Sequence, residues 1–216
     1  MNIILFGPPG AGKGTQADNL VQAFNLFKIS TGDLLRKEIN KKSFLGNKIK
    51  SMINTGLLVP DDIINNFIQN IVSNKSYSNR LVFDGYPRNL NQVSNLNILL
   101  KKNNQEISCV LSLKIEQDLV IKRILGRQIC SSCGLIFNIF FKPSTNINHQ
   151  CDPKFLKKRS DDNEKTIKNR FVTYAKETAP ILNYYKKETL LYEIDGSSDI
   201  STIYQQICQI ISLLDT

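Results

Sequence analysis

The chain of 216 residues lacks any apolar run close to the roughly 20 residues that a membrane-spanning helix requires. No basic leader precedes its first apolar residues, Ile3 to Phe6, and these lead directly into a glycine-rich stretch. A secretory signal peptide would need a basic start and a cleavage site. We therefore expect a cytoplasmic protein with no membrane contact.

Cysteines are few, and their number, five, is odd. An odd count argues against a disulfide framework in a cytosolic chain. Cys109, in a strand-like run, and Cys208, in a helical pattern near the C-terminus, are predicted to be small core residues. The other three cysteines form a cluster that needs a separate explanation.

A long basic stripe is also missing, although the net charge is +9. The excess comes largely from lysines scattered in pairs such as Lys41-Lys42 and Lys101-Lys102, which is typical of solvated helix faces. The charge therefore gives little support to nucleic-acid binding, and a phosphate-rich small substrate explains part of the remainder.

Short apolar runs alternate with amphipathic stretches, which indicates a parallel sheet covered by helices in one α/β domain. Two segments, residues 30–59 and 127–160, do not fit the alternation and are predicted to be satellites on one core. The predicted strands are residues 2–6, 28–30, 80–84, 108–114 and 190–195.

Helical spacing predicts the elements between these strands. One helix follows the glycine-rich stretch, another begins at Pro60 with two acids in its first turn, and the last spans about 199–214. A long helix from about residue 161 should bend or restart near Pro180, because proline cannot donate to the helix ladder.

The most informative segment is GPPGAGKGT, from Gly7 to Thr15, between the first strand and the first helix. Such a loop turns several backbone N–H groups inward, and the positive end of the following helix points at the same place. Lys13 adds a full charge for the outer phosphates of a nucleotide. Gly14 stands where a general phosphate-binding loop carries Ser or Thr, and the hydroxyl comes one residue later. We predict that the chain binds a nucleoside triphosphate.

Further motifs follow in a fixed order along the chain. They are Ser30 to Arg36 (STGDLLR), Gly56 to Asp61 (GLLVPD), Asp84 to Arg88 (DGYPR), Gln92, Arg123, Gly126-Arg127, Arg159 to Asp162, and Arg170. This ordered set resembles the adenylate kinase family in its long-lid form, from the first strand to the last helix. The resemblance implies a five-stranded parallel sheet flanked by helices, a helical insertion for the nucleoside monophosphate and a small β lid. The implied division is residues 1–29, 60–126 and 161–216 for the core, 30–59 for the AMP-binding insertion and 127–160 for the lid.

The resemblance also implies Mg²⁺-dependent phosphoryl transfer, ATP + AMP = 2 ADP. Bringing two polyanions together depends mainly on positioning and on neutralising charge, for which planar guanidinium groups are suited. Arg36 and Arg88 are expected to hold the AMP phosphate, and the remaining arginines to close over the transferring group and its neighbours. The implied catalytic residues are Lys13, Asp84, Arg88, Arg123, Arg127, Arg159 and Arg170.

The two substrate sites follow from the same resemblance. Thr31, the backbone of Leu57 to Val59 and Gln92 resemble the adenine-reading set of AMP-specific kinases. The implied ATP-binding residues are Gly10, Ala11, Gly12, Lys13, Gly14, Thr15, Arg127, Ile136, Phe137 and Ser198. The implied AMP-binding residues are Thr31, Arg36, Leu57, Leu58, Val59, Gly85, Tyr86, Pro87, Arg88, Gln92, Arg159 and Arg170.

Asp84 ends a predicted strand at the rim of the sheet, where ligands bind in open α/β folds. It resembles the family's aspartate that orients the water shell of Mg²⁺, with Thr15 near the phosphates. No serine or cysteine, nor the single histidine, His149, is placed for covalent catalysis. We therefore expect direct in-line transfer.

Three cysteines have the spacing of a zinc ribbon, namely Cys130, Cys133 and Cys151. By resemblance they imply a structural zinc ion in the lid. The family's fourth ligand usually stands three residues after the third, where this chain has Lys154, a poor zinc ligand. Asp152 or His149, or a water, is predicted in its place; a lid without zinc would depend on packing alone.

Two alternatives stay open. A related nucleoside monophosphate kinase with another acceptor, or with GTP as donor, would have the same fold and mechanism. An RNA-binding zinc-ribbon protein would need stacking aromatics on a basic surface, and Phe137, Phe140 and Phe141 are expected instead to pack within the lid. The expected partners are ATP, AMP and ADP, with no nucleic acid, and a monomer is the default.

Overall fold

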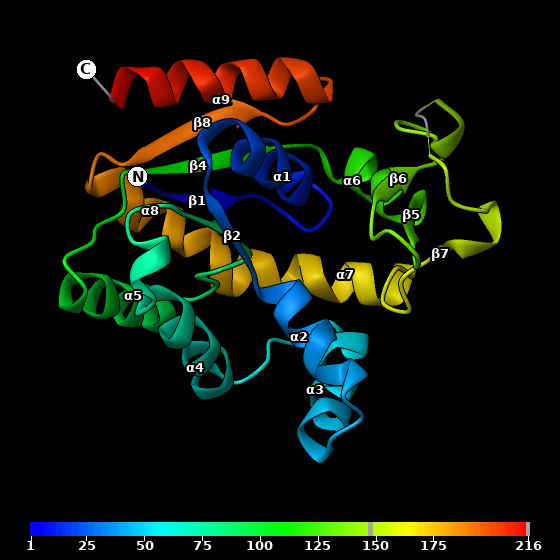
Figure 1. The fold of residues 1–216 in the computed structure, drawn as a ribbon, viewed down its shortest axis with the longest axis horizontal. Coiled ribbons are helices and arrows are strands. Elements are labelled where there is room, and N and C mark those ends of the chain that lie inside the picture. The colour runs from blue at the N-terminus through cyan, green and yellow to red at the C-terminus, as the bar shows by residue number, and fades with distance from the viewer. Residues whose placement is uncertain (147–148, 215–216) are drawn as a thin grey trace.

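The computed structural model describes residues 1–146 and 149–214, and its core is a five-stranded parallel sheet in the order β2-β3-β1-β4-β8 (Figure 1). The predicted α/β architecture is confirmed, and each predicted strand is correct to within one residue at either end. The strands of this sheet are β1 (Asn2–Phe6), β2 (Phe27–Ser30), β3 (Leu81–Asp84), β4 (Cys109–Lys114) and β8 (Leu191–Asp195).

Helices cover both faces of the sheet because its central strands are apolar on both sides. Ile4 and Phe6 pack with helices α4, α5 and α8, and Ile3 and Leu5 pack on the opposite face with α1 and α9 (Figure 1). In the described part of the chain, no helix has both the length and the apolar character of a membrane span. The helices are α1 (Lys13–Phe24), α2 (Thr31–Asn40), α3 (Phe44–Thr55), α4 (Asp61–Val72), α5 (Leu90–Lys102), α6 (Gln117–Leu125), α7 (Glu164–Thr173), α8 (Ala179–Lys187) and α9 (Ile200–Leu214).

The predicted long helix after residue 161 is interrupted, as expected, close to Pro180. Helix α7 ends at Thr173, one turn with π-helical hydrogen bonding spans Tyr174–Thr178, and α8 continues with Pro180 in its first turn. Proline is tolerated there because the first N–H groups of a helix have no intrahelical acceptor.

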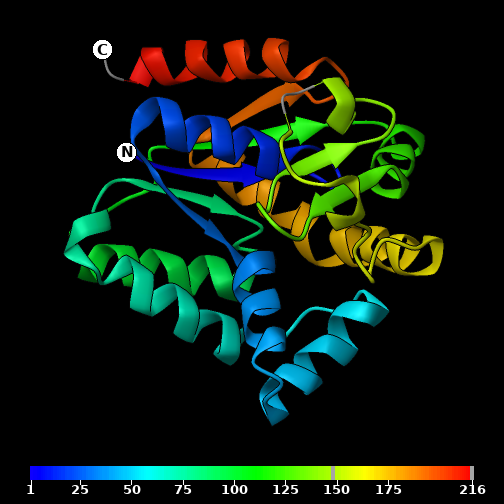
Figure 2. The ribbon, with the colours of Figure 1, turned by 45° about the vertical axis from the view of Figure 1, so that its right-hand side comes forward.

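Helices α2 and α3 project from the core as a hairpin (Figure 2). The end of α3 is bound to α7: the Thr166 hydroxyl donates to the carbonyl of Asn54 at 2.7 Å, and the Asn169 amide donates to that of Thr55 at 3.0 Å. These carbonyls have no partner within α3, so α7 supplies the hydrogen bonds that the helix end lacks. The segment that follows, Leu57 to Val59, is thereby fixed to the core.

The lid segment contains a small antiparallel sheet of order β6-β5-β7, made of Arg127–Cys130 (β5), Ile136–Asn138 (β6) and Leu156–Lys157 (β7). Phe137 is buried in it, as expected. Phe140 and Phe141 instead remain 53% and 44% exposed, with the ammonium of Lys122 within 5.3 and 5.8 Å of their ring centres. The expectation that all three rings pack inside the lid is therefore wrong for two of them, because so small a sheet has room for little more than one ring.

Candidate functional site

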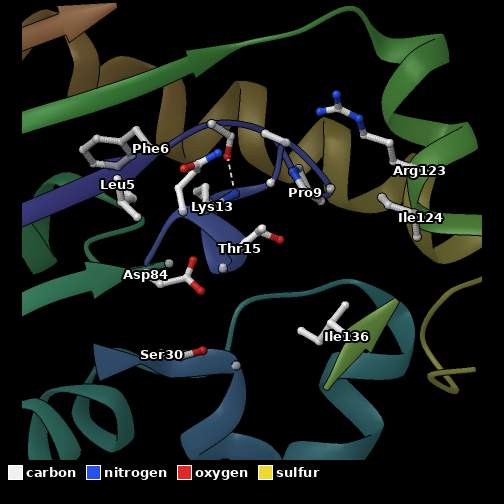
Figure 3. Close-up of a pocket in the computed structure, with 18 of the residues that line it drawn as sticks. Leu5, Phe6, Pro9, Lys13, Thr15, Ser30, Asp84, Arg123, Ile124 and Ile136 are labelled. Atoms are coloured by element: carbon white, nitrogen blue, oxygen red, sulfur yellow. Dashed lines mark hydrogen bonds between the residues drawn. The ribbon is translucent and has the colours of Figure 1, made fainter. Parts of the chain in front are cut away.

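A cavity of about 1210 Å³ lies at the carboxyl ends of β1, β2 and β3, and extends between the α2–α3 hairpin and the lid. Figure 3 shows Lys13, Thr15 and Asp84 on its core side and Ile136 on its lid side. Every predicted ATP- or AMP-binding and catalytic residue lines this cavity except Tyr86.

The loop after β1 has the backbone of a phosphate cradle. Gly10 has a φ of +84°, and a Cβ there would lie 2.6 Å from the Cγ1 atom of Ile124, so only glycine fits. Gly12, with a φ of +99°, is the N-cap of α1, and its side-chain-free position leaves the first N–H groups of the helix open to the cavity. These donors and the positive end of α1 favour an anion at this place.

Lys13 lies at the centre of the cradle. Its ammonium donates to the carbonyls of Gly7 at 2.7 Å and Pro8 at 2.9 Å. Burial lowers the pKa of Lys13 to about 8, partly opposed by the nearby carboxylate of Asp84, and neighbouring arginines lower it further. An anionic phosphate would offset the cost of burying this positive charge, because it replaces the favourable interaction with water that burial removes.

Several arginines surround the same space. Arg127 pairs with Asp162, with Nε and Oδ2 2.8 Å apart, and Arg170 pairs with Asp161. Arg159 differs from these two arginines, because its Nε atom is buried without a hydrogen-bond partner among the described residues. Burial, followed by the charges of Arg127 and Arg36, lowers the pKa of Arg159 to about 10.

Arg88 shows the same shortage of negative charge. Burial and the charge of Arg170 lower the pKa of Arg88 to about 10, and its Nε atom donates to the carbonyl of Gly85 at 2.7 Å. Like charges at close range destabilise one another unless a counter-charge intervenes. The arginines therefore form a site prepared for a polyanion.

Arg123 lies apart from this cluster, although it lines the same cavity. Its guanidinium donates to the carbonyl of Gly196 at 2.8 Å, and its carbon Cζ lies 5.5 Å from the ring centre of Phe141. Figure 3 shows it beside Ile124, away from Lys13. Arg123 thus contacts the loop after β8, next to the predicted residue Ser198, and also lines the cavity.

The residues predicted to bind AMP line another part of the cavity, which contains Thr31, Arg36, Gln92 and the segment Leu57 to Val59. The Thr31 hydroxyl donates to the carbonyl of Gly85 at 2.8 Å, and its oxygen accepts a longer hydrogen bond from Nη2 of Arg88 at 3.4 Å. Leu57 lines the cavity and is 61% exposed.

Tyr86 is the predicted AMP-binding residue that the structure removes from the cavity. Its ring is 1% exposed and packs in the core near Phe83, and its hydroxyl donates to the side chain of Asn65 at 2.8 Å. Its neighbours Gly85 and Pro87 do line the cavity. Because consecutive residues at a strand end point in different directions, the motif DGYPR did not distinguish the packing residue from those that face the ligand.

Asp84 ends β3 level with Leu5 of β1 and Ser30 of β2, so its carboxylate emerges at the rim of the sheet. Within the described residues it forms no ion pair, and its Oδ2 atom lies close to Gly14. Lys28 was not predicted; it pairs with Asp18 at 2.8 Å and also lines the cavity. Its signal in the sequence was a lysine inside the otherwise apolar second strand.

The lid cysteines gather around one point with a histidine. The ligand atoms of Cys130, Cys133, His149 and Cys151 all lie within 4.8 Å of one another, and the Cys133 sulfur is 3.5 Å from Nε2 of His149. A tetrahedron with Zn–S bonds of about 2.3 Å has edges of about 3.8 Å, so these four donors suit a structural zinc ion. The turn that brings the first two together is closed by the Gly134 N–H, which donates to the carbonyl of Cys130 at 2.9 Å.

Asp152, one of the two predicted fourth ligands, is not part of this group. Its carboxylate accepts from the backbone N–H of Lys154 at 2.8 Å and pairs with the ammonium of the same residue at 3.0 Å. It caps the short helix that begins at Pro153, whereas the His149 ring packs on Phe137 with ring centres 4.6 Å apart and faces the cysteines. The prediction of Asp152 as a ligand is therefore corrected in favour of His149.

Several known proteins with similar sequences are adenylate kinases. A family model described as adenylate kinase matches residues 5–190. The adenylate kinase of Pelagibacter ubique (strain HTCC1062) is 43% identical over 213 residues, which cover 99% of this chain and 100% of that protein. The adenylate kinase of Thermosipho melanesiensis is 38% identical over 98% of this chain and 99% of that protein, and that of Clostridioides difficile is 38% identical over 96% of each. With the phosphate cradle and the arginine cluster, these similarities show that the chain belongs to the adenylate kinase family.

Proposed function

We propose that this protein catalyses the reversible transfer of the terminal phosphoryl group of ATP to AMP, giving two molecules of ADP. The observation that carries the proposal is the joining, in one cavity, of a phosphate cradle and an arginine cluster in which Arg88 and Arg159 have no ion-pair partner among the described residues. A volume of about 1210 Å³ leaves room for two nucleotides end to end.

On the donor side, residues Gly10 to Thr15 bind the ATP phosphates through their backbone N–H groups and Lys13. Ile136 and Phe137 of the lid and Ser198 of the loop after β8 border the remainder of the donor nucleotide. Arg123 contributes by holding that loop. This assignment is supported by the hydrogen bonds from Arg123 to the loop and by the position of all these residues along one cavity.

On the acceptor side, Arg36 and Arg88 hold the AMP phosphate, and Thr31, Gln92 and the backbone of Leu57 to Val59 read the base. Arg127, Arg159 and Arg170 neutralise charge on the group in transit. Their guanidinium groups are suited to this because they stay charged when desolvated. Closure of the lid over the site would exclude water, which is a competing phosphoryl acceptor.

Asp84 and Thr15 are the residues that would hold the Mg²⁺ of the ATP complex, Asp84 through waters. The carboxylate at the strand end, free of ion pairs within the described residues, fits an oxygen-ligand site beside the phosphates. When bound, Mg²⁺ neutralises charge on the phosphates. The protein's own groups position the AMP phosphate in line with the donor, so no covalent enzyme intermediate is needed.

We further propose a structural zinc ion on Cys130, Cys133, His149 and Cys151, and a division into core, AMP-binding insertion (30–59) and lid (127–160). A monomer in the cytoplasm remains the default expectation. A metal held by four protein ligands has no open position for substrate, so its role is to stabilise the lid.

The proposed function is tested by measuring ADP formation from ATP and Mg²⁺ with AMP, GMP, CMP and UMP as acceptors. Turnover with AMP alone supports both the reaction and the base-reading assignment. Turnover with another acceptor, or with GTP as the better donor, would retain the mechanism and replace the substrate. Inactivity of folded protein with all four acceptors, together with tight, salt-dependent binding to single-stranded RNA, would favour the zinc-ribbon alternative.

ATP affinity is expected to depend on pH above neutrality. The free protein has a Lys13 pKa of about 8, and bound phosphate raises that pKa, so affinity is full below pH 8 and falls by up to tenfold per pH unit above it. Calorimetric titration of ATP between pH 7 and pH 9.5 measures this. In Lys13→Arg the decline should vanish, because guanidinium stays charged across that range; a decline of equal size in both proteins would rule out Lys13 as its cause.

Loss of the proposed zinc site is expected to weaken the lid. His149→Ala and Cys133→Ser should each lower bound zinc from one equivalent to well below one, and lower the midpoint of thermal unfolding. Metal analysis and thermal melting provide the measurements. Asp152→Ala is the matched control, since its carboxylate lies outside the four ligands; zinc loss in Asp152→Ala with retention in His149→Ala would reverse the ligand assignment.

A further inference from the structure

A chain of polar groups joins the starts of α4 and α5 beneath the acceptor part of the cavity. The Gln92 side chain, only 2% exposed, donates from Nε2 to Oδ1 of Asp61 at 2.6 Å, and its Oε1 atom accepts the backbone N–H of Arg88 at 2.8 Å. The Asn89 amide donates to both oxygens of Asp61 at 3.0 and 3.1 Å. Asp61 therefore receives hydrogen bonds from both side-chain amides.

The directions of these bonds are fixed by chemistry. A backbone N–H only donates and a carboxylate only accepts, so the oxygen of the Gln92 amide must face Arg88 and its nitrogen must face Asp61. A rotation by 180° would set two donors against each other at Arg88 and two acceptors against each other at Asp61. Asn89 is held in the same way, because its Oδ1 atom accepts the backbone N–H of Gln92 at 2.8 Å, which leaves its nitrogen for Asp61.

The fixed Gln92 amide still has one hydrogen-bond donor and one hydrogen-bond acceptor free for a ligand. Gln92 retains one N–H and one oxygen lone pair, and it lines the cavity with Thr31 and Val59. Adenine presents a donor at N6 beside an acceptor at N1, whereas guanine presents an acceptor at O6 beside a donor at N1. The two purines thus require opposite senses of a side-chain amide in one pose, as in base-edge recognition generally.

We infer that Asp61 is a positioning residue for acceptor specificity, which holds the amide of Gln92 in the sense that accepts an adenine edge and rejects a guanine edge. This inference rests on the proposed function, since it assumes that the base of the acceptor reaches Gln92. Asp61 itself does not touch the substrate in this account. Together with the backbone N–H of Arg88, it gives the Gln92 amide one favourable orientation.

The test compares Asp61→Asn with Asp62→Asn. An asparagine at position 61 offers either a donor or an acceptor to Gln92, so one of the two locks is lost. Asp62 is adjacent in the first turn of α4 and exposed, with no side-chain partner among the described residues, so its replacement causes the same change in charge at the same helix end. Initial rates at saturating ATP and Mg²⁺ give kcat/KM for AMP and for GMP, and KM for ATP is measured with AMP.

For Asp61→Asn we expect the ratio of kcat/KM for AMP to that for GMP to fall about tenfold, with KM for ATP within twofold of the unchanged protein. Asp62→Asn should leave the ratio unchanged, and Asp61→Glu, which still only accepts, should retain most of it. A ratio unchanged in Asp61→Asn while both rates decline would reduce Asp61 to a structural role and overturn the inference. So would an equal fall in Asp62→Asn. If the wild-type protein is inactive with AMP, the proposed function itself is contradicted before any variant is compared.

Discussion

Lys13→Met is expected to lower kcat by about three orders of magnitude. The ammonium of Lys13 is held by the carbonyls of Gly7 and Pro8 at the centre of the phosphate cradle, in a place where burial already lowers its pKa to about 8. A charge kept there against its desolvation penalty is preorganised for the phosphates, and methionine matches its length without the charge. A factor of 10³ corresponds to about 4 kcal/mol of transition-state stabilisation.

Steady-state kinetics and thermal melting measure this together. The lost hydrogen bonds and the relieved desolvation act in opposite directions, so the free energy of unfolding should change by no more than about 1 to 2 kcal/mol. Lys168→Met, at an exposed position of α7, is the matched control and should keep full activity. A kcat for Lys13→Met within tenfold of the unchanged protein would remove Lys13 from the chemistry.

Arg159→Met is expected to abolish most activity while making the protein more stable. The Arg159 guanidinium lies close enough to Arg127 and Arg36 for their charges, together with burial, to lower its pKa to about 10, and its Nε atom is unpartnered within the described chain. Without a nucleotide this arrangement is repulsive, so its removal should raise the melting temperature by about 2–4 °C per kcal/mol gained. During transfer the same charge offsets the charge of the phosphoryl group, and arginines in such positions contribute about 10³ or more in kcat.

Arg159→Lys separates charge from geometry. Lysine retains the charge but not the planar pair of donors, so the kcat of Arg159→Lys should lie between that of the wild-type protein and that of Arg159→Met. Thermal melting without nucleotide and kcat at saturating substrates provide the measurements. A lower melting temperature for Arg159→Met would show that Arg159 supports the fold, and an unchanged kcat would show that it does not act on the substrate.

The sequence predicted the sheet well because the strands are short apolar runs with sharp boundaries. The phosphate cradle was equally readable, since glycine spacing and Lys13 fix backbone geometry locally. The strand order β2-β3-β1-β4-β8 was not predicted, because it depends on how the helices pack on both faces of the sheet.

Side-chain partners were the part that the sequence did not predict. Arg123 and Arg127 belong to one motif region, yet Arg123 turns to the Gly196 carbonyl while Arg127 pairs with Asp162. His149 and Asp152 lie three residues apart, and only the loop path decides that the histidine meets the cysteines. These choices depend on contacts between residues distant in the chain, for which spacing carries no signal.

The network of Asp61, Asn89 and Gln92 shows the same limit. Asp61 stood in the sequence as a good first residue for a helix, and Gln92 as a candidate base reader, but nothing connected them. They lie 31 residues apart and meet because α4 and α5 pack side by side below the sheet. Polar networks of this kind require the tertiary structure, since each member has a complete local explanation of its own.

The most direct test of the central proposal is to follow the terminal phosphate of ATP. The protein is incubated with Mg²⁺, AMP and ATP labelled in its γ-phosphate, and labelled products are separated over time. Direct transfer predicts that the label appears in ADP in step with the consumption of AMP, with none on the protein and none released as orthophosphate. Label released as orthophosphate at a rate independent of AMP would contradict the account, because water and not AMP would then be the acceptor.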